Sequence, residues 1–497
     1  MKKILSLFSI FYFLFSISLY AQNDADALRY SMMHYGGGTA QSIGAGGAFG
    51  AVGADFSSLS INPAGLGLYH VSSFVFTPQF STVKSKSVFE GSTGTSNKYN
   101  LNISNFGIEG TNDLSNKGNW KSVSFGFAMN REESYHASDY YSGTDTTNSM
   151  LDYFVQQANG TSPSNLYNAQ GFGAGLAYMT GLIVPAPRDT TQYYSEAFFP
   201  GAVEKSGVSS SRGAMKEYCL SIAGNYSDKI YLGMTLGIPT YSYHTTSDYT
   251  EKDKNQMYPD FNEFTLTNTL TTTGTGINIK GGIIYRVNDY CRLGLAAHSP
   301  SFVSFTDRYS ASMSSKLDTS GNYTKDSPDG KYNYDLTTPW RVVASGAIIF
   351  GTHGFLSADY EFVDYSSMFF TFNNVGATGE KEQEQKINND IKEKYTSASN
   401  IRIGGELAVD VFRIRAGWGM NGSPFKSSIA KYGSGFNSMN YSAGVGIHDK
   451  GYFIDVAYNR NMQKSFYQPY TLDNLSVPGV KQDFTRANIT VTVGFKY

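Results

Sequence analysis

The sequence predicts an all-β protein, a transmembrane antiparallel β-barrel of about 14 strands with an N-terminal segment in its lumen. Three observations support this prediction. Strand-length stretches of alternating apolar and polar residues recur from residue 70 to the C-terminus. The connections between these stretches alternate between short turns and long loops. The chain has 15% aromatic residues, only 16% charged residues and 52 glycines, a composition that suits amphipathic strands with aromatic girdles.

The N-terminus has the three parts of a secretory signal. Lys2 and Lys3 supply positive charge, residues 4–20 are apolar, and Ala21 is a small residue at the end of the run. We therefore expect a signal peptide over residues 1–21, cleaved near Ala21. An uncut membrane helix is the alternative interpretation of this run. No later run approaches the ~18 apolar residues of a membrane helix, and the mean hydropathy of the chain is −0.30.

Residues 35–68 form a stretch rich in glycine and other small residues. Glycine lets the backbone run where side chains would not fit, so this stretch is suited to packing inside another structure. Phe56 and Leu59 are apolar enough to need burial, which argues against a flexible linker. A dinucleotide-binding loop is disfavoured, because no strand precedes the glycines and no βαβ unit follows. We predict a hatch over residues 22–69 that plugs the barrel, with these characteristic residues: Gly44, Gly46, Gly47, Asn62, Pro63, Ala64 and Gly65.

The barrel itself is predicted over residues 70–497. In the last strand Ile489, Val491 and Val493 share one face, whereas Thr490 and Thr492 share the other. The polar faces are rich in Gly, Ser, Thr and Asn, unlike the Lys- and Glu-rich outer face of a soluble sandwich. The predicted strands lie near 70–80, 100–110, 119–130, 213–225, 229–247, 274–287, 290–312, 333–350, 354–372, 398–409, 411–420, 438–448, 451–470 and 483–497.

The predicted connections are of two kinds. Short turns at one end and long loops at the other are the layout of outer-membrane barrels. An even number of strands also permits antiparallel closure, which leaves no unpaired edge in lipid. A secreted sandwich or propeller is the alternative, but it gives no reason for this sorting. The short connections lie near 226–228, 288–289, 351–353, 410 and 449–450, and the long ones near 81–99, 131–212, 248–273, 313–332, 373–397, 421–437 and 471–482.

The order of these features resembles that of a known family. An export signal, a glycine-rich stretch, an Asn-Pro-Ala tripeptide at 62–64, a series of strands and an aromatic end at 495–497 resemble the FadL/TodX family of outer-membrane transporters for hydrophobic compounds. The match covers residues 22–80 and the C-terminus, and elsewhere it rests on the strand layout. The resemblance implies that Asn-Pro-Ala belongs to a luminal hatch. It also implies a multi-pass protein of the cell outer membrane, surrounded by membrane lipid and inserted by the outer-membrane assembly machinery.

The resemblance further implies facilitated diffusion of a hydrophobic small molecule, such as a long-chain fatty acid or an aromatic hydrocarbon. In that family's scheme the loops capture ligand, the hatch moves, and ligand leaves sideways through a gap beside a kinked strand. We place the kink at Gly126, because strand glycines often mark bends. A general porin for small polar solutes is the main alternative, although the hatch argues against an open lumen. An outer-membrane enzyme is less favoured, because His298-Ser299 and His448-Asp449 fit no catalytic arrangement.

The longest loop, residues 131–212, contains unexpected apolar residues. Residues 149–157 have the spacing of a short amphipathic helix. The apolar residues further on have two open interpretations, a ligand-capture surface at the outer mouth or a cover that closes the barrel. By contrast, residues 380–394 are highly charged and predict a solvated helix. The candidate capture residues are Leu182, Ile183, Val184, Phe198 and Phe199.

Charged residues on the polar strand faces are predicted to lie in the lumen. Glu406 and Arg413 are expected to face each other across the hairpin at Asp410. The expected role of the luminal charges is to fill the lumen and hold the hatch. Alternatively, an arginine binds a ligand carboxylate, because its planar fork suits that group. The main luminal candidates are Arg402, Glu406, Arg413 and Arg415, together with Lys280, Arg286, Arg292, Asp359, Glu361 and Asp455.

The composition argues against several other functions. The net charge is −2 and no basic patch stands out, so we predict no nucleic-acid partner. The seven histidines are scattered without metal-ligand spacing, so we predict no metal and no cofactor. Cys219 and Cys291 are expected to face the lumen and the lipid respectively, and therefore to form no disulfide.

Overall fold

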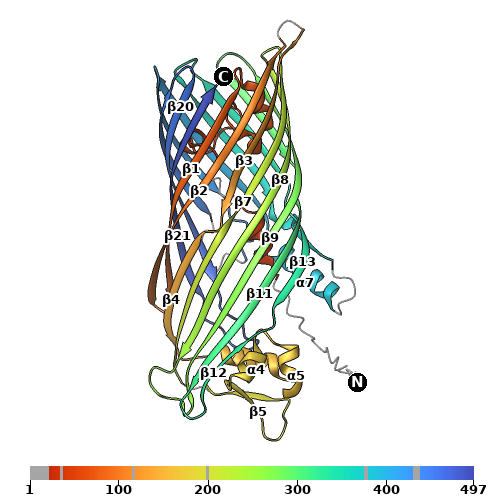
Figure 1. The fold of residues 1–497 in the computed structure, drawn as a ribbon, viewed down its shortest axis with the longest axis vertical. Helices are drawn as coiled ribbons and strands as arrows, with labels where there is room; N and C mark the ends of the chain where they lie inside the picture. Colours follow the sequence, from red (N-terminus) through yellow and green to blue (C-terminus); the bar gives the residue numbers. More distant parts are fainter. Residues whose placement is uncertain (1–21, 34–36, 115–117, 198–200, 374–378, 429–436) are drawn as a thin grey trace, which may run out of the picture.

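A tall barrel of tilted antiparallel strands dominates the computed structural model (Figure 1). The structure describes residues 22–33, 37–114, 118–197, 201–373, 379–428 and 437–497. The predicted signal peptide therefore lies outside the described residues. Short turns lie at one end of the barrel, close to the C-terminus, and the longer loops with their small helices lie at the other (Figure 1).

The 14 barrel strands include four that are interrupted and therefore comprise two or three labelled segments. In order around the wall, the strands are β1 (Ser73–Phe89), β2 (Ser92–Asp113), β3 with β4 (Trp120–Ser134 and Ala137–Asp145), β7 (Val203–Tyr226), β8 (Ile230–Lys252), β9 (Phe261–Arg286), β10 with β11 (Cys291–His298 and Phe302–Leu317), β12 with β13 and β14 (Gly321–Asp326, Gly330–Thr337 and Arg341–Ile349), β15 with β16 (Gly354–Asp364 and Phe369–Phe372), β17 (Ser397–Val409), β18 (Phe412–Asn421), β19 (Ser438–His448), β20 (Tyr452–Tyr467) and β21 (Val480–Lys496).

The remaining elements lie in the lumen or in the loops. No helix in the described ranges is long and apolar enough to cross a membrane. The N-terminal elements are α1 (Asp24–Ser31), α2 (Ala40–Gly44), α3 (Ser58–Ile61) and the 3-10 helix η1 (Pro63–Leu68). The loop elements are α4 (Met150–Ala158), α5 (Pro163–Ala169), α6 (Ala174–Met179), the hairpin of β5 (Ile183–Pro185) and β6 (Tyr193–Ser195), η3 (Tyr365–Ser367) and α7 (Glu380–Lys394).

The wall closes between its first and last strands. β21 pairs with β1 from Ser73–Lys496 to Val88–Lys481. β1 in turn pairs with β2 from Ser73–Glu109 to Phe89–Ser92. Antiparallel pairing continues around the ring, so each barrel strand has a neighbour on both sides. The predicted closed antiparallel barrel is confirmed.

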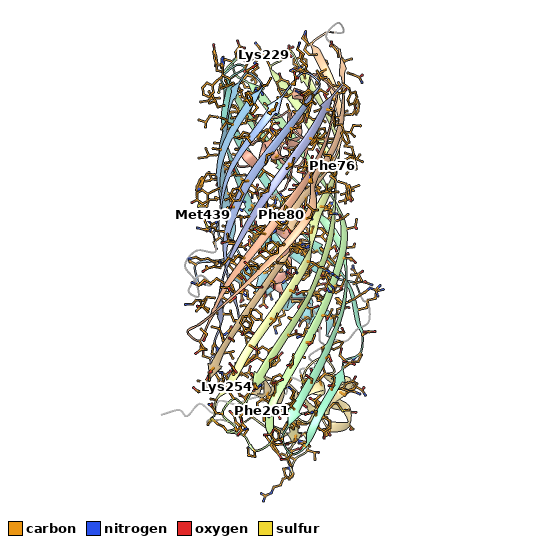
Figure 2. All side chains as sticks on the ribbon, turned by 60° about the vertical axis from the view of Figure 1, so that its left-hand side comes forward. Phe76, Phe80, Lys229, Lys254, Phe261 and Met439 are labelled. Carbon is orange, nitrogen blue, oxygen red and sulfur yellow. The ribbon has the colours of Figure 1, made fainter. Side chains whose placement is uncertain are left out.

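The apolar side chains of the strands point outward. In β21, Ile489 is 49% exposed, whereas Thr490 and Thr492 on the opposite face are fully buried. Figure 2 shows Phe76 and Phe80 of β1 on the outer wall, between Lys229 at the short-turn end and Lys254 at the long-loop end. An exposed apolar surface of this extent marks a membrane contact. The wall is thus inverted relative to a soluble sandwich, in which the apolar face points inward.

All predicted strands are present, but several are longer at the loop end than predicted. The predicted connection 81–99 consists mostly of β1 and β2, which meet at Glu90 and Gly91, both with positive φ. Likewise β8 and β9 occupy most of 248–273, and β11 and β12 most of 313–332. The outer ends of β1 and β2 are mostly polar on both faces, so they lack the period-two apolar pattern although the backbone ladder continues.

Candidate functional site

The hatch segment from residue 40 to residue 68 packs inside the barrel, towards the short-turn end (Figure 1). Almost all of its residues are buried. The amide of Ala40 donates a hydrogen bond of 2.7 Å to Oγ1 of Thr492 on β21. The amide of Gly50 donates one of 3.0 Å to Asp359 on β15. The hatch is therefore bound to opposite parts of the wall through its backbone.

Glycines in the wall make room for the hatch backbone. At six of them, an added Cβ would lie less than 3.0 Å from a hatch atom. At Gly404, for example, the nearest atom is the carbonyl oxygen of Ala45, and at Gly233 it is the backbone of Pro63. Only glycine permits so close an approach. We call this set the wall glycines: Gly107, Gly233, Gly282, Gly294, Gly404 and Gly417.

The Asn-Pro-Ala tripeptide has a local structural role. Asn62 caps η1, because its Oδ1 accepts a 3.2 Å hydrogen bond from the amide of Ala64. Pro63 occupies the first helical position, where its missing N–H costs nothing and its fixed φ suits the helix. Nδ2 of Asn62 donates to the carbonyl of Gly50 at 2.7 Å and to that of Ile283 on β9 at 3.3 Å. One side chain thus orders the hatch and joins it to the wall.

A buried ion pair holds the hatch from the side. Lys280 of β9 forms an ion pair with Glu217 of β7, and both side chains are at most 4% exposed. Nζ of Lys280 also donates to the carbonyl of Ser60 at 3.2 Å, and the Ser60 hydroxyl donates to Glu217 at 2.8 Å. The pair therefore satisfies both polar groups of one hatch residue.

Two further groups of buried charges line the wall around the hatch. Glu361 accepts hydrogen bonds from Arg341 at 2.6 Å and from Arg402 at 2.5 Å. Arg415 donates to Glu406 at 2.6 Å and to Asp455 at 2.5 Å. These arginines are balanced by carboxylates within the wall, as expected for a structural role.

Glu406 and Arg413 lie within ion-pair distance, but they are not directly opposite each other as predicted. Glu406 lies directly opposite Arg415, and Arg413 lies opposite Ala408. A two-residue turn joins the strands, with Val409 opposite Phe412, so the partner of Glu406 lies two residues beyond the predicted one. Arg413 donates to the carbonyl of Asp410 at 2.7 Å, and its Nε lies 3.7 Å from Glu406.

Beyond the hatch, α1 fills a chamber lined by aromatic rings. The ring of Tyr30 stacks on Phe305 with centroids 4.7 Å apart. It makes edge contacts with Tyr135 and Tyr241 at 6.0 and 5.9 Å. Such pairs add about 0.5–1.5 kcal/mol each beyond burial of their area. The aromatic chamber is defined by Tyr135, Met215, Tyr241, Tyr243, Phe305, Tyr332, Tyr334, Leu336, Tyr365 and Phe370.

Polar contacts anchor α1 at both ends of the helix. Asn23 and Asp26 form a capping box at its start. Asp24 accepts hydrogen bonds from Lys394 at 2.7 Å and from the Tyr395 hydroxyl at 2.9 Å. At its end, the carbonyl of Ser31 accepts a 2.5 Å hydrogen bond from Arg341.

The charged helix α7 is not fully solvated as predicted. Its Ile387 and Ile391 are 3% and 0% exposed and belong to the same apolar cluster as α1. These two residues are one helical turn apart and give α7 a narrow apolar stripe among its charges. The prediction of a solvated helix rested on the charged residues and did not take this stripe into account. Because the stripe is buried, α7 covers the chamber.

The loop-end mouth is closed by a small folded unit. The predicted helix is confirmed as α4, and Ser149 caps it in a capping box with Asp152. Leu182 and Ile183 are fully buried in the apolar core of this unit, and Val184 is half-buried. Leu182 and Ile183 therefore form the cover, and they are not an exposed capture surface. Phe198 and Phe199 lie outside the described residues.

The backbone ladder of the wall has a gap beside β3. β2 pairs with β3 only between Asn105–Asn130 and Asp113–Ser122. Residues 92–103 of β2 have ladder partners on β1 but none on β3 or β4 within the described chain. β3 carries a register irregularity between Arg131 and Glu133. The predicted kink at Gly126 is incorrect, since Gly126 is regularly paired with both neighbouring strands.

The histidine fragments considered for catalysis are engaged in structural contacts. Nε2 of His298 lies 2.8 Å from the carbonyl of Ile61, and Nε2 of His448 lies 3.1 Å from Asp455. Among the described residues, no group of three His, Cys, Asp or Glu side chains could hold a metal ion. Cys219 is buried in the lumen beside Ser60, Cys291 is half-buried at the start of β10, and both are free thiols.

Three residues of the lumen were not predicted from the sequence: Tyr30, Arg131 and Arg486. Tyr30 lies within the predicted hatch, residues 22–69, but before the glycine-rich stretch of residues 35–68 on which that prediction rests. Arg131 was assigned to a loop, because its strand loses the apolar alternation at that point. Arg486 could have been found, since it has the same parity on β21 as the inward-facing Asn488 and Thr490.

The fold and the lumen together define a transmembrane β-barrel plugged by its own N-terminal segment. Solved structures with this fold include a Pseudomonas aeruginosa FadL homologue, which is 10% identical with a TM-score of 0.54 over 93% of this chain and 99% of that chain. The Pseudomonas putida toluene transporter TodX is 12% identical with a TM-score of 0.52 over 93% of this chain and 98% of that chain. No protein-family model matches the sequence, and no curated protein is similar to it. The likeness is therefore one of fold.

Proposed function

We propose that this protein is an outer-membrane channel that admits hydrophobic small molecules by facilitated diffusion and is not an enzyme. The observation that carries the proposal is the aromatic chamber inside a closed and plugged barrel. An aqueous pore would have a polar, open lumen, whereas here rings of β8, β11 and β13 converge on α1. The fold shared with a toluene transporter supports the same conclusion.

The proposed route begins at the loop end and finishes in the wall. A ligand enters beneath the unit formed by α4–α6, occupies the aromatic chamber, and displaces α1. Movement of the hatch follows, and the ligand leaves through the gap between β2 and β4. The gap supports lateral exit, because its edges are joined by side chains rather than by a backbone ladder. On β2, for example, the hydroxyl of Ser96 donates to the hydroxyl of Ser138 on β4 at 3.0 Å.

Uptake of labelled toluene and hexadecanoate tests the proposal in cells that lack their own hydrophobic channels. We expect uptake above that of cells without the protein for at least one of these compounds. A small sugar serves as the control, because a general porin would admit it. Entry of the sugar without entry of either apolar compound would show that the protein is a porin.

Replacing Tyr30 tests the role of the aromatic chamber. In the Tyr30→Ala variant α1 loses its ring contacts, so less free energy is needed to displace it. We expect toluene to bind more tightly. Its dissociation constant should fall about tenfold for each 1.4 kcal/mol by which the free energy of displacing α1 is reduced. Quenching of tyrosine fluorescence on titration with toluene measures the change. Tyr194→Ala, which alters an exposed ring in the loop unit, is the matched control. Equal affinities for both variants and the unaltered protein would contradict a ligand site in the chamber.

A further inference from the structure

Five basic side chains lie exposed on the outer wall, towards the long-loop end of β1, β20 and β21. They come from separate parts of the sequence, and only the register of the barrel brings them together. Within the described chain, none of the five takes part in an ion pair. We call this set the cation patch: Lys84, Lys86, Arg460, Lys464 and Lys481.

Strand β21 forms the centre of the cation patch. Its Asp483 lies opposite Lys86 of β1 on one side and opposite Lys464 of β20 on the other. Lys84 and Lys481 lie on the same outer face, two residues from Lys86 and from Asp483 respectively. Because neighbouring strands lie about 4.8 Å apart, the lysines of β1 and β20 are separated by about 10 Å across β21. Their flexible side chains can span this distance from both sides.

The cation patch begins where the strands leave the apolar layer of the membrane. A tilted strand crosses that layer in about 9–11 residues. At the short-turn end, Phe74 of β1 lies opposite the exposed Phe495 of β21. Lys84 follows Phe74 by ten residues along β1. Lys84 therefore lies at the membrane surface on the side of the long loops.

Apolar and aromatic side chains continue from the patch into the membrane layer. Ile489 of β21 lies between Tyr458 of β20 and Phe80 of β1, and all three are exposed on the outer wall, where Figure 2 shows Phe80. Tyr441 of β19, which is also exposed, lies directly opposite Arg460. Tyrosine is enriched at membrane–water interfaces, so Tyr441 marks the level of the lipid head groups. The cations and an apolar surface suited to acyl chains therefore share one face of the wall.

The charges of the cation patch are not balanced within the wall. Asp483 lies among the five cations and offsets one of them, which leaves four positive charges. By contrast, Lys252 of β8 and Lys316 of β11 both pair with Glu263 of β9, at 3.3 and 2.9 Å. Basic residues beside a membrane surface attract anionic lipid head groups. The patch therefore has the charge and the position to bind such a head group.

Phosphate is the lipid head-group anion that suits this arrangement. It carries several strong acceptor oxygens, so ammonium groups can approach it from β1 and from β20 at once. The guanidinium of Arg460 adds a planar fork that matches the geometry of phosphate oxygens. A phosphate ion in solution would gain nothing from the apolar side chains below the patch. A lipid would, because its acyl chains are removed from water there.

We infer that the cation patch binds the phosphate head group of an anionic lipid in the leaflet at the long-loop end. The acyl chains of that lipid lie against Tyr458, Ile489 and Phe80 on the outer wall. This lipid site is separate from the lumen, the hatch and the aromatic chamber. Passage of a ligand through the lumen does not require it, so failure of the lipid site would leave the proposed transport function standing.

The test measures lipid binding to the purified protein in detergent by native mass spectrometry. The probe is lipid A, an acylated disaccharide with two phosphate groups. For Lys84→Gln combined with Lys464→Gln we expect the affinity to fall roughly 25-fold, or about fivefold for each lysine. Lys84→Arg combined with Lys464→Arg should retain binding, because both charges remain. Lys252→Gln combined with Lys316→Gln is the matched control, since it removes the same charge from the wall outside the patch.

Asp483→Asn has the opposite expected result, an affinity about fivefold higher, because it removes a negative charge that faces the phosphate. Equal affinities for lipid A and for the same lipid without its phosphates would overturn the inference. Displacement of lipid A by an equal concentration of inorganic phosphate would also overturn it, since the site would then serve the free anion. Equal losses in the patch variant and the control would show an effect of net charge alone, with the same consequence. The mobility of the folded barrel before and after heating checks that each variant is assembled.

Discussion

In a Gly233→Val variant the hatch is expected to be displaced from its packed position in the lumen, while the barrel remains folded. A Cβ at this position would lie less than 3.0 Å from backbone atoms of Pro63 and Ala64. These backbone atoms cannot rotate away as a side chain could, so the hatch must move. Overpacking of this kind costs about 1–3 kcal/mol, or roughly a 5- to 150-fold shift in population. Ion conductance of the purified protein in a planar bilayer should rise accordingly.

Gly281→Val is the matched control for this experiment. Gly281 lies on β9, next to the wall glycine Gly282, but it is exposed on the outer face and an added Cβ there meets nothing within 4 Å. Valine suits an exposed strand position as well as a luminal one. We therefore expect the conductance of the control to equal that of the unaltered protein. A rise in both variants, or in neither, would contradict the role of the wall glycines.

Lys280→Met is expected to destabilise the protein by about 3–5 kcal/mol, because Glu217 is left as an uncompensated buried charge. The side chain of Glu217 is 0% exposed in the folded state. The same change removes a donor from the carbonyl of Ser60, so the hatch is weakened as well. The urea concentration at which the barrel unfolds, followed by tyrosine fluorescence, measures the loss.

The double variant Glu217→Gln with Lys280→Met separates charge from packing. It removes both charges and keeps the side-chain volumes similar, so most of the stability should return. Glutamine retains an acceptor for the hydroxyl of Ser60, which the unaltered Glu217 binds at 2.8 Å. A double variant as unstable as the single one would show that shape, and not the unpaired charge, caused the loss.

The fold was predictable because the barrel follows a local rule. Period-two alternation identifies each strand, and the sorting of turns and loops identifies the barrel. The rule fails where neither strand face is apolar, so the outer ends of β1 and β2 appeared to be a loop. It also fails at interruptions such as Tyr135 and His136, because the ladder continues on β7 after a break that no pattern marks.

The site was less predictable, because its residues are distant in the sequence. The aromatic chamber joins Tyr30 to Tyr135, Tyr241 and Phe305, and no spacing within one element indicates that these rings meet. The small residues of the hatch were informative, since close approach requires glycine. The wall glycines could not be identified from the sequence, because glycine is common throughout the strands. Which glycines face the hatch depends on the register.

The closing seam between β1 and β21 determines when the hatch must be enclosed. Residues 69–72 are the only link from η1 to β1, so the hatch is tethered to one side of that seam. β21 is the last strand of the chain, and the seam forms only once it is available. A filled lumen offers no space for threading a packed segment afterwards. The sheet must therefore close around the hatch during assembly. The packed hatch then sets the curvature of the sheet as the barrel closes.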